Sequence, residues 1–144
     1  MRRSTRWAWG LLAFTVLLAG CKFKRVEDDR SVSVAAGAGK TMGVGDPMWE
    51  LPAQPKDMDV TVTAKTAPAS PVTLYLVLAD DSEDVETTLK FGGALNASKV
   101  IAQSDKGETP TLQGTAPANK DCRIIVANAG GQPTEVKAKI IGKY

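Results

Sequence analysis

The 144-residue chain contains no histidine, and this absence removes several classes of chemistry at once. Ser-His-Asp and Cys-His catalytic groups both need an imidazole, which is also the commonest metal ligand in proteins. Chemistry based on paired carboxylates, such as that of a glycosidase, stays open as an alternative. We expect a protein that is not an enzyme.

Cysteines and aromatic residues are scarce as well. The two cysteines are Cys21 and Cys122, and the aromatic residues are three Trp, two Tyr and three Phe. Cys122 lies in an apolar run, so we expect a buried, unreactive thiol. Trp49 is expected to cover one end of the core, with stacking against a ligand as the alternative. Because carbohydrate binding generally needs exposed aromatics on one face, this composition argues against it.

No apolar run is long enough to form a spanning helix, which needs roughly 20 residues. The longest run, residues 7–18, has about a dozen residues, the length of a signal-peptide apolar region. It follows Arg2, Arg3 and Arg6, with no acidic residue near them, and it ends at the small residues Ala19 and Gly20. We therefore expect residues 1–20 to be a signal peptide.

The end of this segment, Leu18-Ala19-Gly20-Cys21, resembles the lipobox of bacterial lipoproteins. In that family the cysteine thiol receives a diacylglyceryl group, the peptide before it is cleaved, and the new amino group is usually acylated. The resemblance implies that Cys21 is lipidated and holds the chain in a membrane of the bacterial cell envelope. Lys22 follows the cysteine; since Asp there retains enterobacterial lipoproteins in the inner membrane, the outer membrane is favoured. The alternatives are an ordinary signal peptide with an incidental cysteine and an uncleaved transmembrane anchor.

Without residues 1–20 the chain has 124 residues, enough for one small domain and a tether. Three of the 18 basic residues lie in the removed segment, which leaves 15 basic against 16 acidic residues. This balance argues against nucleic acid as a partner, because such a protein needs a concentrated basic face. We expect residues 21–40, charged and then rich in Ala and Gly, to be a flexible tether, with a short edge strand at 31–34 as its only regular structure. The folded domain is expected over residues 41–144.

Strand patterns dominate that part. Residues 58–65 alternate between apolar and polar, which predicts a half-buried strand, and residues 72–79 are apolar on both faces, which predicts a central strand. Residues 122–127 are a second strongly apolar run, apolar on both faces, and predict another central strand; further strands are expected at residues 99–103, 111–115 and 134–141. The Gly-rich residues 128–133 are expected to form a hairpin loop, and the lysines of the last strand are expected to protect a sheet edge.

A single short helix is expected after this central strand. Asp81 or Ser82 can cap it, Val85 and Leu89 would face inward at i, i+4, and glycines at 92–93 would end it. Calcium binding is the functional alternative for this acidic segment, because calcium takes six to eight oxygen ligands. The candidate calcium ligands are Asp80, Asp81, Asp84 and Glu86.

Short strands with frequent turns and one helix predict an all-β fold, a small antiparallel β-sandwich of jelly-roll or immunoglobulin-like type. Residues 58–144 also resemble pre-peptidase C-terminal (PPC-like) modules, in the run 72–76, the approach 114–121, the run 124–128 and a glycine turn into a final strand. That resemblance implies a non-catalytic accessory domain. The expected function is therefore a lipid-anchored envelope protein with a structural or protein-binding sandwich; a calcium- or carbohydrate-binding module is the alternative.

Overall fold

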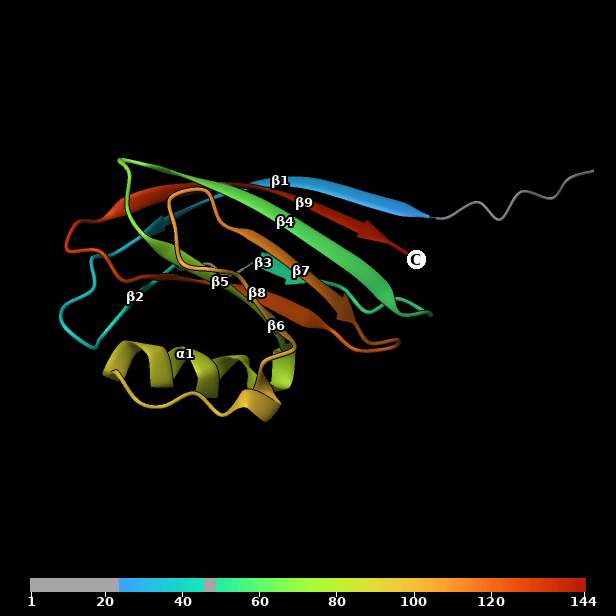
Figure 1. The fold of residues 1–144 in the computed structure, drawn as a ribbon. Helices are drawn as coiled ribbons and strands as arrows, with labels where there is room; N and C mark the ends of the chain where they lie inside the picture. The colour runs from blue at the N-terminus through green and yellow to red at the C-terminus, as the bar shows by residue number, and fades with distance from the viewer. Residues whose placement is uncertain (1–23, 46–48) are drawn as a thin grey trace, which may run out of the picture.

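The computed structural model describes residues 24–45 and 49–144. Two antiparallel sheets pack face to face, and a helical layer lies against the second sheet (Figure 1). The predicted antiparallel β-sandwich with one short helix is confirmed. Within the described ranges, no helix has the length and apolar character to cross a membrane.

The first sheet, here called the outer sheet, has one face on the core and the other in solvent. Every second residue of β4 and β9 is buried, which is the period of a half-buried strand. Its strands follow the order β1-β9-β4-β7, with bounds β1 (Arg25–Val34), β4 (Met58–Ala67), β7 (Thr111–Ala116) and β9 (Thr134–Lys143).

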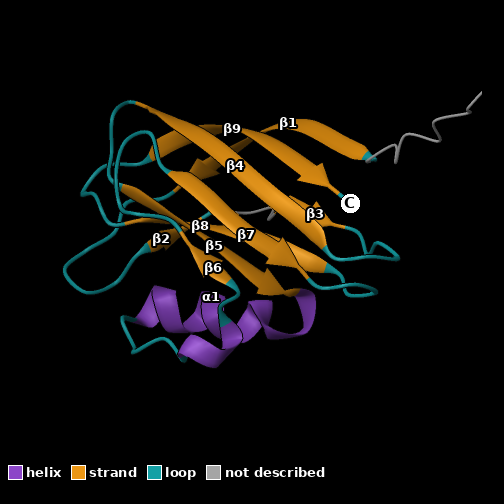
Figure 2. Ribbon diagram, turned by 45° about the vertical axis from the view of Figure 1, so that its right-hand side comes forward, coloured by secondary structure: helices purple, strands orange, loops and turns teal. Residues whose placement is uncertain are grey.

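The second sheet, here called the middle sheet, is covered on both faces (Figure 2). Six consecutive residues of β5 are buried, and so are six of the seven residues of β8, which confirms the predicted central strands. The sheet has the order β2-β8-β5-β6, and β3 also pairs with β8; the bounds are β2 (Gly43–Val44), β3 (Trp49–Leu51), β5 (Val72–Leu78), β6 (Ala102–Gln103) and β8 (Cys122–Asn128).

The helical layer covers the far face of the middle sheet. It comprises η1 (Ala79–Asp81), α1 (Ser82–Phe91) and η2 (Ala97–Lys99). Val85 and Leu89 are buried against the sheet as predicted, and Gly92 ends α1 with φ 71°. The expected side-chain cap is wrong: Asp81 makes no cap hydrogen bond, and the Ser82 hydroxyl donates to the Ala79 carbonyl at 2.7 Å. The single 3-10 turn η1 leads directly into α1, so the chain is already helical before the first residue of the α-helix.

The structure corrects the expected tether. Residues 25–34 form β1, which pairs with β9 over its whole length, so the sandwich begins at Arg25 rather than at residue 41. Only Val32 and Val34 of this strand are buried, because β1 lies at the sheet edge and its first half carries charged side chains. Backbone pairing with β9 therefore holds a segment whose side chains lack an apolar alternation.

The loop after β8 is not the expected hairpin, because β8 and β9 belong to different sheets. Asn128, fully buried, organises this crossing. Its amide nitrogen donates to the carbonyls of Gln132 and Ala35, at 2.8 and 3.1 Å. Its oxygen accepts from the Gly130 N–H at 2.9 Å and the Ser70 hydroxyl at 2.7 Å, so all its hydrogen-bonding capacity is used.

Two smaller expectations also change. The strand expected over residues 99–103 shrinks to the two residues of β6, because η2 occupies its start. β9 lies between β1 and β4, so its lysines do not protect an edge. On β1, which is an edge, Asp28 and Arg30 share the face of the buried valines, and such inward-pointing charges discourage pairing with another chain.

Candidate functional site

The candidate lipidation residue, Cys21, lies outside the described residues, and its lipidation stays a prediction. The structure does describe where the chain that follows it enters the fold. The Lys24 N–H donates to the Tyr144 carbonyl at 2.9 Å, and the Tyr144 N–H donates back to the Lys24 carbonyl at 3.0 Å. The ladder of β1 and β9 thus already includes the third residue after Cys21.

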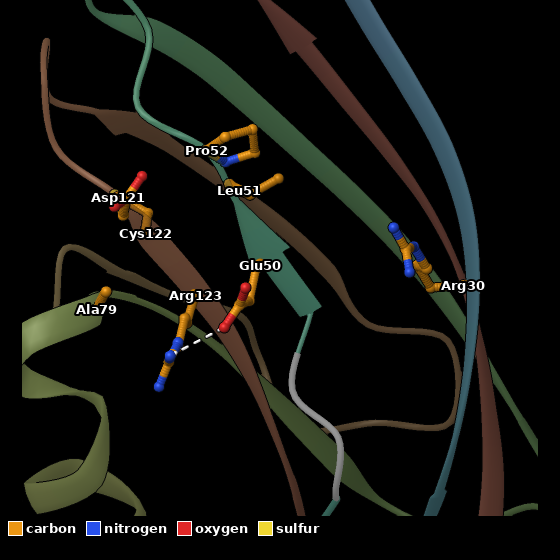
Figure 3. Close-up of a pocket in the computed structure, with 8 residues that line it drawn as sticks. All are labelled: Arg30, Glu50, Leu51, Pro52, Ala79, Asp121, Cys122 and Arg123. Carbon is orange, nitrogen blue, oxygen red and sulfur yellow. Dashed lines mark hydrogen bonds and ion pairs between the residues drawn. The ribbon is translucent and has the colours of Figure 1, made fainter.

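A cavity of about 440 Å³ lies where β1 and β3 leave the flank of the sandwich open (Figure 3). In that view Arg30 lies beside β1 on one side, and the other lining residues come mostly from β3, β8 and the segments next to them. The residues that line it are Arg30, Glu50, Leu51, Pro52, Ala79, Asp121, Cys122 and Arg123.

The charged groups of this cavity already have partners within the protein. The Arg123 guanidinium contacts a Glu50 carboxylate oxygen at 2.9 Å and donates to the Ser82 hydroxyl at 3.0 Å. Arg30 pairs with Asp28 at 2.6 Å. The contacts of Arg123 connect β8 with β3 and with the start of α1.

Asp121 and Cys122 complete this flank. Asp121 accepts the Ala53 N–H at 2.8 Å, which fixes the loop after β3. Cys122 is a free cysteine that is buried, as predicted. Burial, followed by the nearby charge of Asp121, raises the pKa of the Cys122 thiol, so the reactive thiolate is disfavoured at neutral pH.

The four candidate calcium ligands are distributed over η1 and α1, and two of them pair with lysines. Asp84 contacts Lys99 at 2.6 Å, and Glu86 contacts Lys90 at 2.5 Å, one helical turn away. The hydrogen bond from Lys99 to Asp84 raises the pKa of the lysine. Among residues 24–45 and 49–144, no three Asp, Glu, Cys or His side chains form a group that could hold a metal ion.

Among residues 24–45 and 49–144, aromatic side chains do not form a stacking surface. Trp49 is 5% exposed and belongs to the core between the sheets, which confirms its predicted packing role. Tyr75 is buried on the helical side of the middle sheet, and burial raises the pKa of its phenol. Phe91, at the end of α1, is the one large apolar side chain classed as exposed in the described chain.

A group of lysines lies on the solvent face of the outer sheet, and sequence reasoning missed it. This lysine patch consists of Lys65 on β4 and of Lys137 and Lys139 on β9, all exposed. Lys65 lies directly opposite Lys137 in the register, an arrangement of like charges that is destabilising. The three lysines line a surface cavity of about 450 Å³; the other residues that line it are Asp29, Arg30, Ser31, Thr63, Ala64 and Ala138.

One lysine of the patch has an ion pair. Lys139 contacts Glu27 on β1 at 2.5 Å, and Arg25 contacts the same carboxylate at 2.9 Å. The hydrogen bond from Lys139 is the main cause that lowers the pKa of Glu27, and it raises the pKa of Lys139 in turn. In the described part of the chain no ion pair involves Lys65 or Lys137.

The two features that sequence reasoning missed share one cause. The alternation of β4 and β9 shows that Lys65 and Lys137 face solvent, but not that the two strands are neighbours in this register. The flank cavity depends on β1, whose charges suggested a tether. In both cases pairing between distant segments creates the site.

A comparison of the chain with protein-family models gave no match, and a comparison with curated proteins gave none. The resemblances to the lipobox and to PPC-like modules therefore stay predictions from the sequence.

Proposed function

We propose that this protein is a lipid-anchored lipoprotein of the bacterial cell envelope, held by Cys21, whose β-sandwich has a structural or protein-binding role and no catalytic one. The observation that carries the proposal is the order of segments in the chain. A basic start, a short apolar run and Leu18-Ala19-Gly20-Cys21 come first, and a folded sandwich begins four residues after the cysteine. Lys22 favours the outer membrane.

The described side chains support a non-catalytic role. The chain has no histidine, the charged groups of the flank cavity all have partners within the protein, and the pKa of the Cys122 thiol is raised. A nucleophile would instead need a neighbouring base or a lowered pKa.

Anchorage is tested by growing bacteria that express the full chain with labelled palmitate. Wild-type protein should carry the label and sediment with membranes, and Cys21→Ser should lose both properties. Cys122→Ala is the matched control, since it removes the other thiol and leaves the motif intact, and it should keep the label. An unlabelled wild-type protein, or a Cys21→Ser variant that stays in the membrane fraction, would refute the proposal.

A further inference from the structure

The first strand leaves little chain between the sandwich and a lipid on Cys21. Lys24 is the third residue after Cys21, and three steps along the chain at about 3.3–3.6 Å each span at most about 11 Å. The headgroup layer on each side of a bilayer is itself about 5–7 Å thick. A sandwich attached in this way is held against the membrane surface and cannot stand off from it.

The layers of the domain carry opposite charge. On the solvent face of the outer sheet five cations stand against four anions: Arg25, Lys65, Lys137, Lys139 and Lys143 against Glu27, Asp29, Asp59 and Glu135. In the helical layer, residues 79–99, five carboxylates stand against two lysines. In Figure 1 the helical layer and the outer sheet lie on opposite sides of the middle sheet, so the charge difference runs across the thickness of the domain.

The lysine patch is within reach of an anchored surface. Arg25 lies opposite Lys143, Asp29 opposite Lys139 and Ser31 opposite Lys137, so the patch begins only a few residues along β1 from the anchored end. At about 3.3 Å per residue, this places the patch roughly 13–20 Å from the start of the strand. An anionic surface under this face would relieve the repulsion between Lys65 and Lys137.

We propose that the solvent face of the outer sheet is turned to the bilayer, with Lys65, Lys137 and Lys139 against the phosphates of anionic lipid headgroups. This inference rests on the proposed lipid anchor at Cys21, which sets the distance. Juxtamembrane lysines are attracted to anionic lipids within about one Debye length, roughly 8 Å at physiological ionic strength. The acidic helical layer is repelled by the same surface and faces away from it.

The experiment uses the lipidated chain in vesicles of phosphatidylethanolamine and phosphatidylglycerol that contain a headgroup nitroxide quencher. A fluorophore is placed on single cysteines at three exposed positions: Thr63→Cys in the patch, Thr87→Cys on the helix, and Lys56→Cys in the loop between β3 and β4 at the end of the sandwich. The native Cys122 is buried, so the fluorophore should react with the introduced cysteine and not with Cys122. We expect quenching at residue 63 to exceed that at residue 87 at least about twofold.

A charge-removing variant tests the lysines themselves. Replacement of the three patch lysines by Gln should reduce quenching at residue 63 roughly twofold, as should raising the salt to about 1 M, which shortens the Debye length to about 3 Å. The matched control replaces three exposed lysines outside the outer sheet by Gln, namely Lys40, Lys90 and Lys106. This variant should show the same quenching at residue 63 as the parent protein.

The outcomes separate the two proposals. If palmitate does not label the protein, the anchor and the orientation fail together. If the protein is labelled but residue 56 is quenched most, the sandwich stands on its end and the orientation alone is wrong. Strongest quenching at residue 87, or no response to loss of the patch lysines, overturns the orientation as well.

Discussion

The two sheets of this protein differ in what covers them. The outer sheet has a core face and a solvent face, and every second residue of β4 and β9 is buried. The middle sheet lies between the outer sheet and the helical layer, and β5 and β8 are buried almost throughout. The outer sheet can therefore carry charged side chains on its solvent face, whereas the central strands of the middle sheet have no solvent face.

This difference in coverage explains why the lysine patch lies on the outer sheet and not on the middle one. The lysine patch lies on the uncovered face of the outer sheet, where charged side chains keep their hydration. The middle sheet provides the rigid support, since its strands contribute to two apolar clusters at once. Because only one face of the outer sheet is buried, charged residues on its other face do not disturb the packing of the core.

The largest expected effect comes from the centre of the sandwich. Leu74→Ala should lower the free energy of unfolding by about 3 kcal/mol, because Leu74 is 0% exposed between the sheets and the substitution leaves a cavity. Ile141→Ala, at a half-buried position on the solvent face of the outer sheet, should cost less than about 1 kcal/mol. Urea denaturation measures both, and equal losses would remove the distinction between the faces.

The edge strand gives the next effect. Val34→Ala should cost about 2 kcal/mol, because Val34 is 1% exposed and packs in the core although it lies in the segment expected to be a tether. Ser33→Ala, exposed on the same strand, is the control and should change stability by less than about 0.5 kcal/mol. If denaturation does not distinguish Val34→Ala from the control, β1 is not part of the folded domain.

The helical layer should respond locally. Val85→Ala should cost about 1.5 kcal/mol and should speed hydrogen exchange of the α1 amides more than that of β4 or β9, because Val85 attaches the helix to the middle sheet. Glu83→Ala, on the exposed side of α1, should leave the exchange pattern unchanged. If hydrogen exchange became faster by the same factor in all elements, the helical layer would unfold only together with the core.

The smallest effect concerns the exposed ion pair on the outer sheet. The pKa of Glu27 is lowered from its ordinary 4.5, so its contribution to stability is present above pH 4.5 and is lost as the pH falls through the folded-state value. Glu27→Gln should therefore have a slightly lower Tm than wild type at pH 7, and the two should converge near pH 3. Glu108→Gln makes the same charge change at an exposed position away from Lys139 and from the helix, and a Tm difference with the same pH dependence in that variant would contradict the role assigned to the Glu27 ion pair.

Local pattern determined much of this fold. The alternation at 58–65 and 134–141, the doubly apolar runs at 72–79 and 122–127, and the spacing of Val85 and Leu89 each predict the observed element. Burial on one face, on two faces or on a helical stripe leaves a distinct period in the sequence, and that period does not depend on which strands are neighbours. The burial of Cys122 follows from the apolar run in which it lies.

Tertiary structure alone decided which segments became partners. β1 is a strand because β9 offers it a backbone ladder, since its own charges provide no apolar period over most of its length. The crossing at Asn128 and the opposition of Lys65 and Lys137 likewise arise from pairings between residues far apart in the chain. Backbone hydrogen bonds are nearly the same for every residue type, so the sequence carries little information about register, and the sites that register creates become visible only in the fold.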